Sequence, residues 1–275
     1  MCIISRQENK INHEKANPRG CDHSHSYGRL SVVGIGPGDI SLLCQKAREI
    51  IDGCEVIVGY KTYLKLLGEL VNNKEIISSG MTEEIKRAKV AINKALEGKK
   101  VCVISSGDAG IYGMAGLILE LLSEEAMSKI ELEIIPGISA ASGCAGLLGA
   151  PLMHDFAVIS LSDLLTDKAL IEQRVELAAQ ADFVIVLYNP KSKKRIEPLK
   201  SAWNILMRHK NPQTPVGIVR NAYRENQEIE ITTLKEMLSS EKIDMLTTII
   251  VGNSKTYVKG KFMITPRGYN FKKER

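Results

Sequence analysis

The chain has 275 residues, of which 44% are hydrophobic and 25% charged, a composition typical of a globular protein with one large or two smaller domains. No apolar stretch could span a bilayer and the N-terminus lacks a basic-then-apolar secretory signal, so we expect a cytoplasmic protein without membrane contact. The net charge of +5 and the 5% of aromatic residues are compatible with an anionic substrate and give little support for nucleic acid.

Residues 1–28 are polar and lack apolar periodicity, which predicts a disordered N-terminal extension. Cys21, His23 and His25 could bind a transition metal, but no second ligand pair follows at zinc-finger spacing, so a solvated tail without metal is the preferred interpretation. The chain has no C-x-x-C spacing. Its cysteines are therefore expected to be buried, reduced thiols rather than disulfides or cluster ligands; they are Cys2, Cys21, Cys44, Cys54, Cys102 and Cys144.

The folded chain is predicted to begin with a strand from Leu30, followed by a glycine-rich loop at residues 34–38 and a helix over residues 42–50. This order resembles a dinucleotide-binding fingerprint. However, Pro37 removes a backbone donor that a pyrophosphate would need, and no acidic residue ends the next strand, Glu55–Gly59. A nicotinamide oxidoreductase is therefore disfavoured, and a ligand without phosphates fits better. Tyr60 and Lys61 follow that strand and suit the rim of a site for a flat anion.

The stretch from Val101 to Gly116 predicts a buried strand (101–104), a loop of small residues and a helix. It follows an amphipathic helix predicted for residues 81–96. A third loop of this kind, residues 136–142, comes after a strand at 132–135 and before a helix at 144–148. Loops of small residues at the carboxyl ends of strands are where open α/β sheets bind ligands, because glycine lets the main chain approach closely.

A change in composition near Pro151 predicts a domain boundary, with an N-terminal α/β domain at residues 29–149 and a C-terminal one at 150–275. The second half is expected to have short strands at residues 156–161, 183–187, 216–219, 229–232 and 247–251. Helices are predicted at residues 169–179, 200–208 and 234–238. Strands that end in Asn, Pro or Gly rather than in long hairpins predict two α/β lobes with a cleft between them.

Four stretches resemble the tetrapyrrole methylase family: VGIGPGD (33–39), SGDAGIY (106–112), PGISA (136–140) and TTIIVG (247–252). The resemblance covers about residues 30–269. Within the family, residues 154–166, 188–192 and 221–224 are similar to the subgroup that methylates C17 in the corrin pathway. Where that subgroup continues with Pro-Trp, this chain has Asp167-Lys168, so the next helix can start differently.

The resemblance implies the two-domain fold of class III methyltransferases, with S-adenosylmethionine in the inter-domain cleft and S-adenosylhomocysteine as its product. It also implies a homodimer in cobalamin biosynthesis. The residues that it assigns to the cofactor are Pro37, Gly107, Asp108, Ile111, Tyr112, Ser139, Ala140, Tyr188, Asn189, Asn221, Ala222, Thr248 and Ile249. A cofactor with a sulfonium and no phosphate also explains why the first loop carries Pro37.

The implied substrate is an anionic tetrapyrrole, cobalt-containing or metal-free, that is methylated at C17 with ring contraction. Cations at the cleft mouth would orient its carboxylates, above all Lys61, Arg220 and Arg224. The further basic residues at this mouth are Lys191, Lys193, Lys194 and Arg195. Asp108, His154 and Asp155 are the titratable residues that could move a proton. Methylation at another ring position, or a nucleotide- or RNA-binding protein that is no enzyme, stay open as alternatives.

Overall fold

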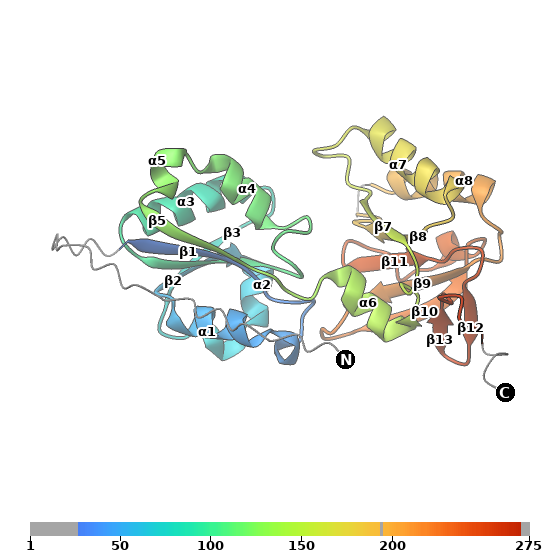
Figure 1. The fold of residues 1–275 in the computed structure, drawn as a ribbon, viewed down its shortest axis with the longest axis horizontal. Coiled ribbons are helices and arrows are strands. Elements are labelled where there is room, and N and C mark those ends of the chain that lie inside the picture. Colours follow the sequence, from blue (N-terminus) through green and yellow to red (C-terminus); the bar gives the residue numbers. More distant parts are fainter. Residues whose placement is uncertain (1–26, 193–194, 271–275) are drawn as a thin grey trace, which may run out of the picture.

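The computed structural model describes residues 27–192 and 195–270, which form two α/β lobes (Figure 1). This confirms the predicted fold class. Residues 1–26, with Cys21, His23 and His25, lie outside the described part of the chain, as do Lys193 and Lys194. The first strand already begins at Gly28, at the end of the predicted extension.

The first lobe is built on a five-stranded sheet in the order β3-β2-β4-β1-β5, in which every pairing is parallel. The β-branched runs of its three central strands, β2, β4 and β1, are buried on both faces, as is typical of parallel strands. Because the strands are parallel, their carboxyl ends meet at one edge of the sheet. The strands are β1 (Gly28–Gly34), β2 (Val56–Tyr60), β3 (Glu75–Ser79), β4 (Lys100–Ser105) and β5 (Ile130–Ile135).

Helices cover both faces of this sheet (Figure 1). On one face lie α1 (Gln45–Gly53) and α2 (Lys61–Leu66), with the short 3-10 turns at Ile40–Leu42 and Gly68–Val71. On the other lie α3 (Glu84–Leu96), α4 (Met114–Leu121) and α5 (Glu124–Met127). Two apolar clusters, one on each face, fix the sheet between these layers. The helices α2 and α5 were not predicted because they are short, and the edge strand β3 was not predicted because it is largely exposed and half polar.

The second lobe has a mixed five-stranded sheet in the order β10-β9-β11-β8-β7, in which only β7 and β8 pair in parallel. The predicted strands are confirmed, but β9 and β10 form an antiparallel hairpin that the sequence did not reveal. The strands are β7 (Phe156–Ser160), β8 (Val184–Tyr188), β9 (Pro215–Arg220), β10 (Glu228–Thr233) and β11 (Thr247–Val251). A small sheet joins β6 (Gly149–Ala150), β12 (Tyr257–Lys259) and β13 (Phe262–Ile264).

Two helices, α7 (Lys168–Gln180) and α8 (Glu197–His209), pack on one face of the second sheet, and α6 (Ala140–Leu148) packs on the other. Asp167 caps α7, because its carboxylate accepts from the Ala169 N–H at 2.9 Å. Asp167 stands where the similar subgroup has the proline of a Pro-Trp pair, and it serves here as the N-cap of the helix. The helix predicted for residues 234–238 is wrong: only a 3-10 turn at Met237–Ser239 follows β10. The two buried apolar residues Leu234 and Met237, three positions apart, gave the helical spacing, but the segment is too short for an α-helix.

The packing of α6 against the second sheet indicates where the boundary between the two lobes lies. Ala141, Cys144 and Leu148 lie in the cluster that covers the second sheet, together with Val186 and Ile250 from its strands. These contacts favour a boundary in the loop before α6, about ten residues ahead of the predicted Gly149. The boundary itself stays a prediction, which separate expression of the two halves would test.

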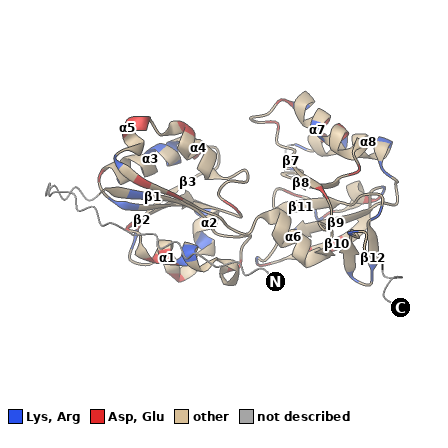
Figure 2. Cartoon of the chain, viewed as in Figure 1, with Lys and Arg blue, Asp and Glu red and all other residues tan. Residues whose placement is uncertain are grey.

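The four cysteines in the described part form no disulfide; Cys54, Cys102 and Cys144 are buried as expected, whereas Cys44 is exposed at the start of α1. Among the described residues no helix is both long and apolar enough to cross a membrane. No group of three or more His, Cys, Asp or Glu side chains in residues 27–192 and 195–270 is placed to hold a metal ion. Figure 2 shows charged residues distributed over the outer helices and strands of both lobes.

Candidate active site

The glycine-rich loops predicted in the first lobe meet at the carboxyl edge of its sheet. Gly36 and Gly107 exchange backbone hydrogen bonds of 3.0 and 2.8 Å, which join the loop after β1 to the loop after β4. A Cβ on Gly137 would lie 2.2 Å from the Gly107 carbonyl oxygen, and one on Gly34 would lie 2.7 Å from the Gly137 nitrogen. Glycine is therefore required at both positions, because three loops pack backbone against backbone there.

The carboxylate of Asp108 holds this arrangement. Its Oδ1 accepts hydrogen bonds from the N–H groups of Gly110 (2.8 Å) and Ile111 (3.1 Å), and its Oδ2 accepts one from Gly137 (3.0 Å). Each bond joins a charged acceptor to a backbone donor, which makes it stronger than a neutral pair. Both oxygens are thus engaged with the main chain, and the geometry supports a positioning role for Asp108 rather than the predicted proton transfer.

We expect Asp108→Asn to lower the free energy of unfolding by about 1–3 kcal/mol. In the wild-type protein each backbone N–H donates to a carboxylate oxygen, whereas in the variant the asparagine NH2 would face one of these N–H groups and leave it without an acceptor. The affinity for S-adenosylhomocysteine should fall as well. Chemical denaturation and calorimetry measure the two effects. A variant with wild-type stability and affinity but a large loss of kcat would instead indicate that Asp108 is a base.

These loops and the facing strand ends of the second lobe enclose a pocket with about 860 Å³ of space between protein atoms, part of it open to solvent. Every predicted cofactor residue except Ile249 lines it. The lining also includes several residues that the sequence analysis did not assign. The full lining is Pro37, Tyr63, Ser106, Gly107, Asp108, Ile111, Tyr112, Ser139, Ala140, Cys144, Tyr188, Asn189, Asn221, Ala222, Arg224, Met245, Leu246, Thr247 and Thr248.

Tyr112 and Tyr188 connect the two sides of the pocket. The Tyr112 hydroxyl, from the first lobe, donates to the Val158 carbonyl and accepts from the Ser160 N–H, both at 3.2 Å, on β7 of the second lobe. Its ring lies edge to face with Tyr188 at 5.7 Å. The Tyr188 hydroxyl accepts from the Ala141 N–H at 2.7 Å, and burial raises its pKa. Both rings are therefore fixed by the protein before any ligand binds.

Strained backbone conformations gather at the same place. Tyr112, Asn189, Asn221 and Tyr223 have positive φ angles of 53, 52, 50 and 57°. Outside glycine such angles cost energy and often mark functional sites. The strand ends at Asn189 and Asn221 thus turn sharply enough to present backbone and small polar groups to the pocket, as the Asn-containing ends of β8 and β9 predict.

Arg224 crosses from the second lobe into the first. Its Nε donates to the Pro37 carbonyl at 2.7 Å and its Nη2 to the Ser106 hydroxyl at 2.8 Å. Its stem packs over Gly38, where a Cβ would lie 2.3 Å from Arg224 Cγ. Burial lowers the pKa of the Arg224 guanidinium, and this effect exceeds the opposite electrostatic effect of the nearby Tyr63. Arg224 therefore ties the first loop to the second lobe and also lines the pocket.

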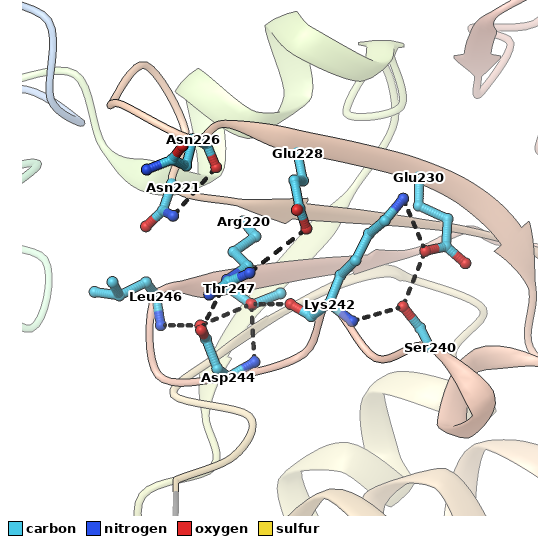
Figure 3. Close-up of polar contacts among 10 residues, drawn as sticks. All are labelled: Arg220, Asn221, Asn226, Glu228, Glu230, Ser240, Lys242, Asp244, Leu246 and Thr247. Carbon is cyan, nitrogen blue, oxygen red and sulfur yellow. Dashed lines mark hydrogen bonds and ion pairs between the residues drawn. The ribbon is translucent and has the colours of Figure 1, made fainter.

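Arg220, predicted at the substrate, lies outside the pocket lining and is engaged with acidic side chains (Figure 3). Its Nε donates to Asp244 at 2.8 Å, and Glu228 lies 3.6 Å from its Nη1. Asp244 also accepts from the Leu246 N–H at 2.7 Å. Arg220 thus positions the loop before β11, from which Met245 and Leu246 reach the pocket.

Other predicted residues are also absent from the pocket lining, among them Lys191 and Arg195, the described members of the further basic set. Lys61 is exposed at the start of α2. His154 and Asp155 are exposed next to each other, with 3.5 Å between Nδ1 and Oδ2. Ile249 is fully buried in the core between the second sheet and α7 and α8. Since neighbouring residues of a strand face opposite sides, Thr248 and Ile249 cannot both face the pocket.

The sequence analysis missed six residues of the lining: Tyr63, Ser106, Cys144, Met245, Leu246 and Thr247. Tyr63 lies on α2, which was not predicted, and burial raises its pKa. Burial also raises the pKa of Cys144 to about 11, so this thiol is a neutral part of the wall. Helical spacing from Ala140 would have revealed Cys144, because residues four apart share one face of a helix.

Comparisons with known proteins identify the family of the chain. The profile of the family Tetrapyrrole (Corrin/Porphyrin) Methylases matches residues 29–238. A cobalt-factor III methyltransferase of Priestia megaterium is 54% identical over 89% of this chain, which spans 46% of that relative's length. A probable cobalt-factor III C(17)-methyltransferase of Salmonella typhimurium is 50% identical over 87% of this chain and 99% of its own length.

The fold comparison points the same way. The crystal structure of the methyltransferase CobJ superposes with a TM-score of 0.82 at 33% identity, and covers 87% of this chain and 100% of its own. The family profile and the superposition with CobJ thus each cover most of the chain. The chain belongs to the tetrapyrrole (corrin/porphyrin) methylases.

Proposed function

We propose that this protein transfers a methyl group from S-adenosylmethionine to C17 of a tetrapyrrole, with ring contraction, in cobalamin biosynthesis. The substrate would be cobalt-factor III or precorrin-3B. The observation that carries the proposal is the pocket between the lobes, built from the four stretches that resemble the family. The relatives' names support the choice of C17.

The donor groups of the pocket suit S-adenosylmethionine. A nucleoside and an amino acid need hydrogen-bond partners and flat apolar contacts, which Ser139, Asn189 and Thr248 and the methyl groups of Ala140 and Ala222 would supply. We assign the methionine and ribose side to Gly107 and Ile111. Pro37, in the loop after β1, would border the substrate side.

Positioning would supply most of the rate acceleration. Asp108 is engaged with backbone N–H groups, and His154 and Asp155 lie outside the pocket. Methyl transfer needs the ring carbon in line with the S–CH3 bond, and holding two reactants in such a geometry is worth about 7–11 kcal/mol at best. We therefore infer that fixed side chains such as Tyr112, Tyr188 and Arg224 act through the shape of the site rather than as bases.

Arg224→Ala should weaken binding of S-adenosylhomocysteine by about 10- to 100-fold, because it removes two charge-assisted hydrogen bonds that hold the Pro37 and Ser106 loops. Lys61→Ala, which removes an exposed cation outside the pocket lining, is the control and should leave this affinity unchanged. Calorimetry compares the two variants. An unchanged cofactor affinity in Arg224→Ala, together with a raised KM for the tetrapyrrole, would show instead that Arg224 binds substrate carboxylates directly.

The assay of the function itself is incubation with cobalt-factor III and S-adenosylmethionine, followed by mass spectrometry. A product that has gained one methyl group supports the proposal. Failure to bind S-adenosylhomocysteine, with binding of NADH or RNA instead, would overturn it. We also propose a cytoplasmic homodimer, as the family resemblance implies, which analytical ultracentrifugation would test.

A further inference from the structure

Two leucines on the loop between β7 and α7 are left uncovered. Leu164 is 72% and Leu165 101% exposed, although both lie within a short connection between regular elements. Single exposed apolar residues are common, whereas two adjacent large ones on one loop form an apolar patch that is a candidate surface for a ligand or partner.

This loop is held at several points. Leu161 is fully buried, and its N–H donates to the Tyr188 carbonyl at 2.9 Å. Arg195 donates to the Asp163 carboxylate at 2.8 Å, with the Arg195 side chain 19% exposed. Asp167 caps α7 at the other end. The leucines therefore sit on a loop anchored on both sides, and their exposure does not come from a loose tail.

The loop also begins at the edge of the pocket. Ser160, the last residue of β7, accepts a hydrogen bond at its hydroxyl from Asn189 Nδ2 (3.0 Å) and donates its N–H to the Tyr112 hydroxyl (3.2 Å). Tyr112 and Asn189 both line the pocket. In Figure 1 the loop extends from β7 toward the side of the first lobe before the chain turns into α7.

The pocket mouth has further exposed apolar residues. Ile111 is 42%, Tyr112 60% and Leu246 49% exposed, although all three line the pocket. They come from both lobes. A ligand that filled only the interior would leave these side chains in water.

We propose that Leu164 and Leu165 form an apolar seat for one face of the tetrapyrrole macrocycle, together with Ile111, Tyr112 and Leu246. This rests on the proposed function. A macrocycle must lie across the mouth of the pocket to bring a ring carbon to the methyl donor. The two faces of the macrocycle are flat and apolar, whereas its carboxylates lie at its rim. Apolar side chains can therefore contact a face while cations and water contact the carboxylates.

The test is the double variant Leu164→Ser/Leu165→Ser, with Leu177→Ser as the matched control, since Leu177 is 57% exposed on α7 and lies outside the pocket lining. Absorbance titration with cobalt-factor III measures tetrapyrrole binding, and calorimetry measures S-adenosylhomocysteine binding. We expect the double variant to bind cobalt-factor III about 10- to 100-fold more weakly through lost apolar contact. Cofactor affinity should stay within about twofold, and the control should match wild type in both assays.

If the double variant bound cobalt-factor III with wild-type affinity, the apolar seat would be refuted, while the proposed function would be unaffected. If the wild-type protein itself bound no tetrapyrrole while it bound S-adenosylhomocysteine, the proposed function would fail, and the seat with it. Sedimentation of both proteins adds a further outcome. A double variant that loses dimers yet keeps its tetrapyrrole affinity would show that a second copy of the chain covers the leucines, which contradicts the seat.

Discussion

Gly137→Ala is expected to destabilise the protein by about 3 kcal/mol or more and to abolish cofactor binding. The added Cβ would lie 2.2 Å from the Gly107 carbonyl oxygen and 2.7 Å from the carbonyl carbon and oxygen of Gly34. All of these contacts are backbone atoms, which cannot rotate away as a flexible side chain could. The loops after β1 and β4 would have to separate, and the Asp108 bond to Gly137 would break.

Gly116→Ala is the matched control, since nothing lies within 4 Å of a Cβ there and Gly116 is exposed on α4. It should be neutral or stabilise the protein by up to about 1 kcal/mol, because alanine is the better helix former. Thermal and chemical denaturation compare the two variants. A Gly137→Ala protein with wild-type stability and wild-type affinity for S-adenosylhomocysteine would contradict the packing of the three loops.

Ala140→Leu should weaken binding of S-adenosylhomocysteine by about 100-fold or more while the protein stays folded. Ala140 is the first residue of α6 and lines the pocket, so a larger side chain takes up space that the nucleoside needs. The start of a helix beside an open pocket tolerates the extra atoms better than a closed core would.

Ala140→Ser serves as the control for this position, because it adds a single oxygen atom and should change the affinity little. Calorimetry gives both affinities, and circular dichroism and the melting temperature report on folding. A collapsed melting temperature in Ala140→Leu would show that Ala140 is a packing residue. Unchanged affinity in a folded variant would remove Ala140 from the cofactor site.

The sequence predicted the first lobe's site better than the second's, for a physical reason. In the first lobe the ligand-facing loops directly follow parallel strands, so the small residues at Gly36, Gly107 and Ser139 locate the edge of the sheet without knowledge of long-range contacts. Asn189 and Ala222 follow strands of the mixed second sheet, and the family resemblance assigned them. The sequence does not predict which side chains join these loops to one another.

The predictions that failed depend on contacts between distant segments. Arg220 and Asp244 are 24 residues apart, and only the antiparallel arrangement of β9 and β11 brings them together. Arg224 reaches Pro37 across 187 residues, a bond between the lobes that the sequence did not reveal, while its predicted contact with substrate carboxylates stays a prediction. Ile249 was assigned with Thr248, although the alternation of a strand allows only one of the two side chains to face the pocket.

The proposed activity is methylation of C17 of a tetrapyrrole in the pocket between the lobes. The most direct test is incubation of the full-length protein with cobalt-factor III and S-adenosylmethionine that carries an isotope-labelled methyl group, followed by nuclear magnetic resonance of the product. We predict a single labelled methyl group on C17 of a ring-contracted macrocycle, and no transfer by the Ala140→Leu variant. A label on another ring carbon, or no transfer by the wild-type protein, would contradict the account.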